Sequence, residues 1–558
     1  MCSSVPQYPQ IFSSASLWPI LYHRAISRTS CLCPACRYQQ RLLHRNEWNL
    51  YRRKCNGTGK SILSIYSEDK PFTVYEPKYW WGDDWDVRDY GRTFDFSRPF
   101  FEQFAELQAV VPRLAIVNTH SENSEYTHLS TQNKDCYLLA CCSYNERCQY
   151  GFWTQNSLDC LDCYTVEKSE RCYQCMNGKN LYHCAYVNDS ENCNHCWFSS
   201  DCVGCSNIFG SRGLRNKSYF LFDRQVTKEE WEQYLGALRL TPRVINDLFE
   251  RLEREGMRIP RKYYRGMSNE DFSGDFLQNC KNTYHAFNCR DCWDVWTSQD
   301  AWRAKDSLDI TEILDVERCY QVEGFIGCDS AFCTKGWSIN NCLYSDICFH
   351  AHDLFGCVGM HSAGYCVFNK EYSKSEYEDL VVRIIYHMQA TGEWGTYFPS
   401  HLTHFGYNET TAAEYYPLRR EEVLARGWNW FDDPEDAMDG PHADYTPPEA
   451  IETVADDIIE KILICEVSGK LYRINKQELE FYRTMGLPLP LRCPKQRRAE
   501  RMNRRNPRQL WKRRCMNHSA KHSNCDPEGR CTNEIETSYA PDRPELVYCE
   551  ACYLAEVY

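Results

Sequence analysis

The spacing of the cysteines constrains this chain more than any other feature of its sequence. There are 35 cysteines in 558 residues, and in the middle of the chain they recur at steps of twelve or nine residues. A constant step over many cysteines indicates a structural repeat, because metal sites need only local clusters. The twelve-residue steps join Cys136, Cys148, Cys160, Cys172 and Cys184; the nine-residue steps join Cys184, Cys193 and Cys202, then Cys280 and Cys289, Cys319 and Cys328, Cys333 and Cys342, and Cys348, Cys357 and Cys366.

The residues around these cysteines favour a parallel β-solenoid. Short runs of Cys, Tyr, Phe, Val and Trp alternate with Asn, Asp, Ser and Gly, which indicates brief strands separated by turns. Equivalent residues of successive coils stack about 4.8 Å apart, so one cysteine per coil would form an internal column. Cysteine is small and readily buried, so packing is the favoured interpretation of the column. The alternative is that C-x-x-C pairs such as Cys160/Cys163 collect soft metals. The number of steps in one coil stays open.

The ladder occurs twice, and each copy is expected to lead into a helix. Phe222-Asp-Arg parallels Phe368-Asn-Lys at an offset of 146 residues. The sequence predicts helices within residues 227–256 and 373–390, with Thr227 and Ser373 as N-caps ahead of acidic first turns.

The two ends of the chain also resemble each other. Residues 33–55 align with residues 493–515 without a gap, and nine of these 23 positions are identical. The match includes Cys33/Cys493, Arg37/Arg497, Arg41/Arg501, Arg45/Arg505 and Cys55/Cys515, and it resumes after an insertion of 13 residues in the second copy. We therefore predict a duplicated zinc-ribbon module.

Only the C-terminal copy keeps a complete set of metal ligands. Four thiolates close a tetrahedral structural zinc site, and the set predicted to hold Zn²⁺ is Cys515, Cys531, Cys549 and Cys552, with Cys525, His518 and His522 as rival ligands. In the first copy the last three of these cysteines are replaced by Thr58, Glu76 and Tyr79. In a further ribbon-like segment Ser468 and Gln496 occupy ligand positions, which predicts a metal-free relic. A second zinc site could come from Cys31, Cys33, Cys36 and Cys55.

These motifs resemble those of a known group of proteins. The ribbon pattern, the run Trp80-Trp81-Gly-Asp-Asp-Trp85 and the cysteine ladder are similar to those of uncharacterised zinc-ribbon proteins with cysteine-rich β-solenoid repeats, inferred from candidate-phyla bacteria. The resemblance covers most of residues 31–558. It implies the architecture and carries little information on function.

Basic residues gather in one segment of an acidic chain. The net charge is −13, yet residues 493–515 hold ten Lys and Arg side chains and one acid, Glu500. Such a density suits a phosphate backbone, and the candidate contacts to RNA or DNA are Arg497, Arg501, Arg505, Arg508 and Arg513. The competing interpretation is that these arginines pair with acidic patches elsewhere in the chain, such as Asp432-Asp433 and Asp456-Asp457.

The expected fold class is mainly β with α: two tandem cysteine-ladder parallel β-solenoids, helical linkers, and zinc-ribbon modules at both ends. The expected order is an N-terminal extension (1–30), a partial ribbon with a basic helix and a Trp-rich segment (31–125), the first solenoid (126–222), a helical linker (223–270), the second solenoid (271–368), a helical and loop segment (369–455), a degenerate ribbon with a basic helix (456–514) and the C-terminal ribbon (515–558).

The sequence favours a cytoplasmic protein with reduced thiols. It has no run of about 18 apolar residues and no recognisable export signal, so neither a membrane nor a disulfide framework is expected. Catalysis is not expected either, because Gly57-Thr-Gly-Lys-Ser61 has Lys54 where a phosphate loop needs its first glycine. The sequence therefore predicts a zinc-binding, non-catalytic scaffold whose solenoid faces bind a protein or glycan partner. The alternative is nucleic-acid binding by the ribbon-linked basic helices.

Overall fold

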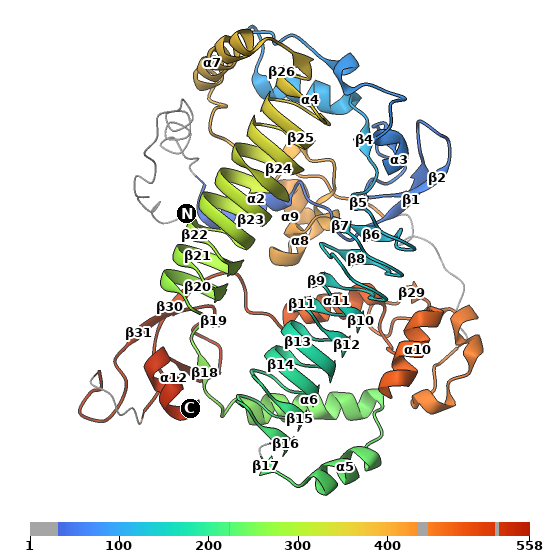
Figure 1. Cartoon of the computed structure of the whole chain (residues 1–558), viewed down its shortest axis with the longest axis vertical. Coiled ribbons are helices and arrows are strands. Elements are labelled where there is room, and N and C mark those ends of the chain that lie inside the picture. The colour runs from blue at the N-terminus through green and yellow to red at the C-terminus, as the bar shows by residue number, and fades with distance from the viewer. Residues whose placement is uncertain (1–31, 223, 434–444, 519–523, 558) are drawn as a thin grey trace.

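Stacked coils of short parallel strands dominate the structure, which confirms a β-solenoid. The structure is a computed structural model that describes residues 32–222, 224–433, 445–518 and 524–557. Its strands form one 11-stranded sheet (residues 127–225) and one 9-stranded sheet (residues 266–371). We call the 11-stranded sheet together with the leading β5–β7 pair the first stack (residues 118–225), and the 9-stranded sheet the second stack. Figure 1 shows both as columns of short arrows.

The strands of the two stacks have the following bounds. The first stack and its leading strands comprise β5 (Asn118–Thr119), β6 (Thr127–His128), β7 (Ser130–Thr131), β8 (Leu139–Ala140), β9 (Phe152–Gln155), β10 (Leu158–Leu161), β11 (Tyr164–Glu167), β12 (Glu170–Tyr173), β13 (Met176–Ala185), β14 (Asn188–Trp197), β15 (Ser206–Phe209), β16 (Ser218–Leu221) and β17 (Arg224–Gln225). The second stack comprises β19 (Gly266–Met267), β20 (Glu270–Gln278), β21 (Lys281–Arg290), β22 (Trp293–Trp296), β23 (Gln299–Glu323), β24 (Phe325–Leu343), β25 (Asp346–Phe355), β26 (Gly364–Val367) and β27 (Lys370–Glu371).

One coil takes twelve residues, which settles the question that the sequence left open. Cys160 lies beside Cys172, and Cys172 beside Cys184, in parallel register. Along the first stack nearly every third residue has a positive φ, for example Asp159, Asp162 and Thr165. Each coil therefore has four three-residue sides. A twelve-residue step reaches the next coil, and a nine-residue step reaches the neighbouring side.

The corners explain why Asn and Asp are so frequent in the ladder. Left-handed backbone is costly for most side chains and least so for Gly, Asn and Asp. Corner residues of successive coils stack, and Asn177 donates a hydrogen bond from Nδ2 to Asp189 Oδ1 at 2.9 Å. The same Asn-to-Asp contact joins Asn123 to Asp135 and Asn282 to Asp294. These side-chain ladders hold the coils together from the outside.

The inward cysteines do more than fill space. The Cys172 thiol donates to two carbonyl oxygens, Glu170 O at 3.5 Å and Leu181 O at 3.7 Å. The Cys136 sulfur accepts a hydrogen bond from Cys148 N of the next coil at 3.4 Å. Ser169 stands in for cysteine elsewhere, because its hydroxyl donates to Glu167 O and accepts from Leu181 N. Cysteine and serine therefore share the task of satisfying backbone groups that face the interior.

Coils of eleven residues occur at the start of the second stack and again in its middle, and the one in the middle breaks the expected step from Cys319 to Cys328. Val316 pairs with Gly327, eleven residues later instead of twelve. Cys319 is buried inside the stack, whereas Cys328 is partly exposed and donates a hydrogen bond to Asn340 Oδ1 at 2.9 Å. Even spacing in the sequence therefore did not place Cys328 in the internal column.

Helices follow each stack, as the sequence predicts. After the first stack come α5 (Lys228–Ala237) and α6 (Pro242–Gly256), and after the second comes α7 (Lys374–Ala390). Thr227 and Ser373 cap α5 and α7 in capping boxes with Glu230 and Glu376, which confirms both predicted N-caps. Shorter helices beyond α7 are α8 (Ala412–Tyr415) and α9 (Arg420–Ala425), with 3₁₀ turns at Ser400–Leu402, Tyr407–Glu409, Ile451–Thr453 and Asp456–Glu460. A further 3₁₀ turn, Val87–Tyr90, precedes the first stack.

The two stacks lie side by side and run in opposite directions along the chain (Figure 1). Trp153 contacts Trp302, with ring centroids 5.2 Å apart. Further along the first stack, Glu167 pairs with Arg290 at 2.7 Å. Further still, Asp189 pairs with Arg265 at 3.0 Å. The partner numbers fall as the first stack advances, which defines the antiparallel arrangement.

The two ends of the chain fold into modules with the same order of elements. The N-terminal module (33–80) has α2 (Pro34–Leu42), β1 (Tyr51–Lys54), β2 (Ser61–Ser64), β3 (Val74–Tyr75) and α3 (Pro77–Trp80); the C-terminal module (493–557) has α11 (Pro494–Asn503), β30 (Trp511–Arg514), β31 (Glu534–Thr537), β32 (Val547–Tyr548) and α12 (Glu550–Val557). This equivalence supports the duplication inferred from the sequence.

Each end module joins the strand that enters one stack. In the N-terminal module, β3 pairs in parallel with β4 (Arg113–Leu114), which follows α4 (Phe100–Val110) and leads into the first stack. In the C-terminal module, β32 pairs in parallel with β18 (Arg261–Lys262), which leads into the second stack. A further pair, β28 (Leu463–Ile464) and β29 (Leu471–Tyr472), precedes α10 (Lys476–Met485).

Candidate metal centre

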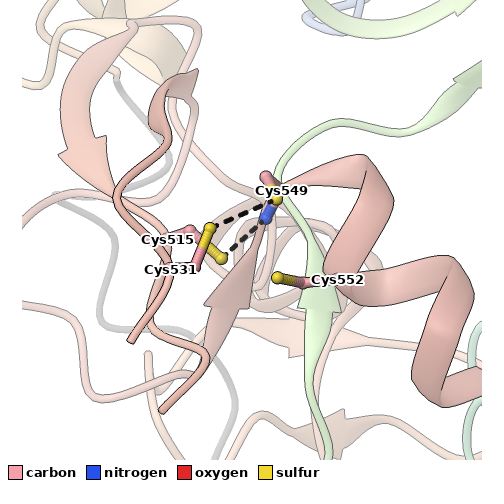
Figure 2. A group of neighbouring side chains, drawn as sticks. All are labelled: Cys515, Cys531, Cys549 and Cys552. Atoms are coloured by element: carbon pink, nitrogen blue, oxygen red, sulfur yellow. Dashed lines mark hydrogen bonds between the residues drawn. The ribbon is translucent and has the colours of Figure 1, made fainter. Parts of the chain in front are cut away.

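Four cysteines of the C-terminal module converge on one point. The Sγ atoms of Cys515, Cys531, Cys549 and Cys552 all lie within 4.8 Å of one another, and all four residues are buried. The sulfur atoms of Cys531 and Cys549 are 3.8 Å apart. Figure 2 shows the four side chains directed toward a shared space. This is the set that the sequence predicts.

The local fold positions each of these cysteines. Cys515 directly follows β30, and Cys531 precedes β31, so the antiparallel pairing of these strands brings the two residues together. Cys549 directly follows β32, and Cys552 lies one turn further along, on α12. The spacing of three residues at the start of a helix turns both thiols toward the same side.

The geometry suits a tetrahedral metal ion. Zn–S bonds of about 2.3 Å in a tetrahedron place neighbouring sulfur atoms about 3.8 Å apart. The sulfurs also accept hydrogen bonds, from Cys549 N to Cys515 Sγ at 3.2 Å and from Asn533 Nδ2 to Cys549 Sγ at 3.3 Å. Burial opposes ionisation of Cys549, but the hydrogen bonds to its sulfur from Asn533 and from the Cys552 backbone and the neighbouring thiols together outweigh it, so the pKa of Cys549 is lowered. Donors directed at a sulfur favour the thiolate that a metal requires.

The rival ligands stand apart from this group. Cys525 forms a backbone bridge with Cys531, yet its thiol is not among the four clustered sulfur atoms. His518 is also outside the group. His522 lies outside the described residues.

The N-terminal module keeps the shape of this centre without its ligands. Thr58 N and Glu76 N donate hydrogen bonds to Cys55 Sγ at 3.4 and 3.3 Å. Thr58 Oγ1 then donates to Glu76 Oε1 at 2.8 Å. The Tyr79 ring packs so closely on Gly57 that a Cβ there would come within 2.6 Å of it. Side-chain contacts therefore fill the position that the metal would take.

A third, similar turn occurs at Cys465. Ser468 N donates a hydrogen bond to Cys465 Sγ at 3.5 Å, and Ser468 Oγ is 3.8 Å from Cys493 Sγ. Gln496 instead donates a hydrogen bond to Glu500. Cys465 and Cys493 belong to no group of three potential metal ligands in the described part of the chain. Ser468 and Gln496, which occupy ligand positions in the sequence pattern, make hydrogen bonds there instead.

The described members of the second predicted zinc set, Cys33, Cys36 and Cys55, form no common ligand group. Cys33 and Cys36 lie close together, with sulfur atoms 3.4 Å apart. Cys55 does not join them in any ligand group among the described residues, because it lies in the β1–β2 turn described above. Cys31 lies outside the described residues.

The arginines suggested for nucleic-acid contacts face the interior of the protein. Arg497 and Arg501 are both buried and pair with opposite oxygens of Asp162, at 2.8 and 2.7 Å. Arg508 pairs with Asp300 at 2.6 Å. Arg497, Arg501 and Arg508 therefore follow the competing interpretation, because they pair with acids of the same chain. Their partners, Asp162 and Asp300, are not in the acidic patches that the sequence analysis named.

The other two candidates also have partners within the chain. The Arg505 guanidinium lies over the Tyr164 ring, 4.5 Å from its centroid. Arg513 donates hydrogen bonds to Ala540 O and to Met516 Sδ, both at 3.0 Å. A phosphate backbone could reach these groups only by displacing contacts that the fold already makes.

A buried cluster that the sequence analysis missed joins the N-terminal module to both stacks. Arg45 pairs with Glu47 at 2.5 Å and with Glu312, and Cys141 Sγ lies 3.4 Å from Glu312 Oε2. Glu47, Cys141 and Glu312 also form a possible ligand group, but the Arg45 guanidinium already supplies positive charge to it. Burial raises the pKa of the Cys141 thiol, so the thiol stays protonated. The adjacent pair Cys141-Cys142 could have indicated this cluster in the sequence, because two adjacent cysteines cannot both face the inside of a coil.

Comparisons with known proteins leave the family open. No protein-family model and no curated protein matches the chain. Among solved structures, the chain is similar to a "putative acetyltransferase from Desulfovibrio desulfuricans G20", with 8% identity over 51% of this chain and 82% of that one, at a TM-score of 0.11. None of the helices in the described ranges is long and apolar enough to span a membrane.

Proposed function

We propose that this protein is a zinc-stabilised, non-catalytic scaffold of two tandem β-solenoids, whose C-terminal module is a zinc ribbon, whose N-terminal module is a ribbon without metal, and whose outer faces bind a partner. The observation that carries the zinc assignment is the cluster of four buried sulfur atoms within 4.8 Å of one another. Four protein ligands complete a tetrahedral shell, so a metal here would hold the module together and would have no open position for a substrate.

The outer face of the first stack offers an aromatic surface to a partner. Tyr182 is exposed, and the His183 and His195 rings stack at 4.7 Å, with Trp197 beside them at 6.0 Å from His183. We call these four residues the aromatic ladder. The Asn180–Asn192 side-chain hydrogen bond runs along the neighbouring corner. Rings beside amide groups offer both apolar contact and hydrogen bonds, which suits a glycan or a polar protein surface.

Metal analysis of the purified protein tests the first part of this proposal. We expect one zinc ion per chain, lost in Cys549→Ser and retained in the matched variant Cys525→Ser, whose thiol is outside the cluster. Several metals per chain, or equal loss in both variants, would contradict the assignment.

Screening against immobilised glycans and a set of candidate proteins tests the second part. If a partner binds the aromatic ladder, its binding should be lost in Tyr182→Ser. Binding should be retained in Tyr144→Ser, which removes an exposed tyrosine elsewhere on the same stack. Binding that instead falls steeply with added salt and selects RNA or DNA would favour the alternative function, although the buried arginine contacts do not support it.

A further inference from the structure

Two cysteines at the start of the N-terminal module lie side by side. Cys33 is the N-cap of α2 and Cys36 lies on the first turn of that helix, and their Sγ atoms are 3.4 Å apart. Neither belongs to a group of three potential metal ligands among the described residues. Two thiols alone cannot complete the tetrahedral shell of a structural zinc ion. The described surroundings of this pair therefore do not repeat the C-terminal centre.

The pair is partly exposed, which distinguishes it from the cysteines inside the stacks. Among the cysteines that the structure describes, the others that are not buried are Cys328 and Cys525. A cysteine reacts with a dissolved disulfide only where that reagent can reach the sulfur. A small disulfide can therefore approach Cys33 and Cys36 without any coil of a stack opening.

The start of α2 brings the two sulfur atoms together. Pro34 occupies the first helical position, and Arg37 N donates a hydrogen bond to Cys33 O at 3.0 Å, which closes the first turn. Residues three apart on a helix share one side, so both thiols point the same way. A disulfide bond is about 2.05 Å long, and rotation of the two side chains about Cα–Cβ can bring the sulfurs to that distance.

The Arg37 side chain holds this turn in place. It pairs with Asp309 Oδ2 at 2.7 Å and donates a second hydrogen bond to Leu32 O at 2.9 Å. One buried guanidinium thus ties down the residue before Cys33 and the residue after Cys36. Groups that are held close together react with each other more readily than with a molecule in solution. The turn therefore favours a bond between these two sulfurs over a lasting bond to an external thiol.

The duplicated module shows that the second thiol is not needed for folding. In α11 the position of Cys36 is taken by Gln496. Cys493 is still the N-cap of that helix, and Arg497 still packs against its stack through Asp162 at 2.8 Å. Helix and packing therefore form with a single cysteine. The presence of Cys36 has an explanation in chemistry rather than in the fold of the module.

We propose that Cys33 and Cys36 form a reversible disulfide site that exchanges with small disulfides of the glutathione type. One sulfur of the pair attacks the glutathione disulfide, which breaks its S–S bond, forms a mixed disulfide and releases one glutathione thiolate. The other sulfur attacks the mixed disulfide, closes the Cys33–Cys36 bond and releases the second glutathione. The two cysteine protons pass to the two glutathione thiolates, so the protein loses two electrons and the glutathione disulfide gains them.

The location at the start of a helix suits this exchange. Backbone N–H groups at a helix N-terminus favour a negatively charged sulfur, which is the form that attacks a disulfide. The site is separate from the C-terminal metal centre and from the aromatic ladder. It therefore depends neither on the zinc assignment nor on the binding of a partner.

Equilibration of the full chain in mixtures of reduced and oxidised glutathione tests this proposal. After an acid quench the remaining thiols are alkylated in denaturant, and the digested protein is analysed by mass spectrometry. We expect the fraction of chains with a Cys33–Cys36 disulfide to rise with the oxidised share of glutathione, and dithiothreitol to reverse it. Cys319, which is buried inside the second stack, should stay reduced throughout and is the internal control.

Two variants show whether the cysteines act as a pair. In Cys36→Ser the intramolecular disulfide should be lost, and the mixed disulfide between glutathione and Cys33 should accumulate because no second sulfur resolves it. Cys328→Ser removes a partly exposed thiol outside the pair and should leave the redox titration unchanged. Melting curves of the reduced variants show that both are folded.

Three results would overturn the proposal. In the first, both thiols of the folded chain stay reduced in an excess of glutathione disulfide. In the second, Cys33 or Cys36 forms its disulfide with a different cysteine of the chain. In the third, the pair becomes reactive only after a chelator has removed zinc, which would make it a metal site. None of these results affects the zinc content expected for the C-terminal centre, so the proposed function is tested independently.

Discussion

Arg497 and Asp162 form a buried ion pair, with Nε and Oδ2 2.8 Å apart. The equivalent residue of the N-terminal module, Arg37, makes the same contact with Asp309 at 2.7 Å. Asp162 and Asp309 both occupy left-handed corners, one in each stack. Helix α11 of the C-terminal module therefore clamps the first stack, and helix α2 of the N-terminal module clamps the second. Because β18 and β4 tie these modules to the opposite stacks, each module bridges both.

Removing the charge of Asp162 should strongly destabilise the protein. In Asp162→Asn, Arg497 and Arg501 both lose their shared carboxylate while they remain buried. Breaking a buried pair on one side costs about 3–5 kcal/mol. The matched control is Asp315→Asn, which breaks an ion pair with Arg303 that is about half exposed, and should cost less than about 1 kcal/mol. Denaturant unfolding measures both, and equal losses would contradict the clamp.

Removal of metal should loosen the C-terminal module and leave its N-terminal counterpart intact. With a chelator, amide hydrogen exchange should rise in residues 531–557 and at β18, because β18 pairs with β32 next to Cys549. Residues 51–79 serve as the internal control, since contacts of Thr58, Glu76 and Tyr79 fill that position. A rise in both modules, or in neither, would show that the cysteine cluster does not hold the fold.

Thiol labelling of the native protein should distinguish Cys328 from Cys319, although both belong to the same nine-residue step. Cys319 is fully buried and its thiol donates to Glu317 O, whereas Cys328 is partly exposed. Burial raises the pKa of the Cys328 thiol as well, so exposure decides the difference. We expect mass spectrometry to find Cys328 alkylated well before Cys319. Equal alkylation rates of the two cysteines in the folded protein would contradict the eleven-residue coil that places Cys328 outside the internal column.

Stability should fall as pH rises from about 4.5 to about 7 through the contribution of Glu323. Burial raises the pKa of this side chain from its ordinary value of 4.5 to about 7, and neither carboxylate oxygen has a hydrogen-bond partner among the described residues. The folded state thus holds a proton that the unfolded state releases, so this stability is present below about pH 4.5 and is lost through about pH 7.

Glu323→Gln should remove that slope, because the amide does not titrate. At pH 8 the variant should be more stable than the unmodified protein, and the difference should shrink toward pH 4.5. The control is Glu317→Gln, which changes a carboxylate that is 40% exposed. Thermal melts across this pH range provide the measurement. An unchanged slope in Glu323→Gln would show that another group is responsible.

The C-terminal centre could be predicted from the sequence because its ligands lie close together in the chain. Cys549 and Cys552 are three residues apart, and the alignment of the two chain ends identified Cys515 as their partner. The same alignment located the eroded positions Thr58, Glu76 and Tyr79. Local turns of this kind depend on few residues, and the structure reproduces them.

The coil was only partly predictable. The twelve-residue step revealed a repeat, but its meaning depends on left-handed corners at every third residue, which cysteine spacing does not encode. The even spacing predicted that Cys328 lies in the internal column, and this was wrong. The coil there is one residue shorter, which cannot be recognised from the nine-residue distance between Cys319 and Cys328. The buried set of Arg45, Glu47, Cys141 and Glu312 was missed because it draws on three separate parts of the chain.

The repeat, the duplication and the cysteine cluster at the C-terminus could be read from the order of residues alone, since each depends on residues related by short or regular intervals. The role of the basic segment became visible only in the packing. Arg497 and Arg501 meet Asp162 more than 300 residues away, because two stacks that run in opposite directions bring their corners against the module helices. A dense run of arginines has the same appearance in sequence whether it faces a phosphate backbone or a buried carboxylate, and only the packing tells these apart.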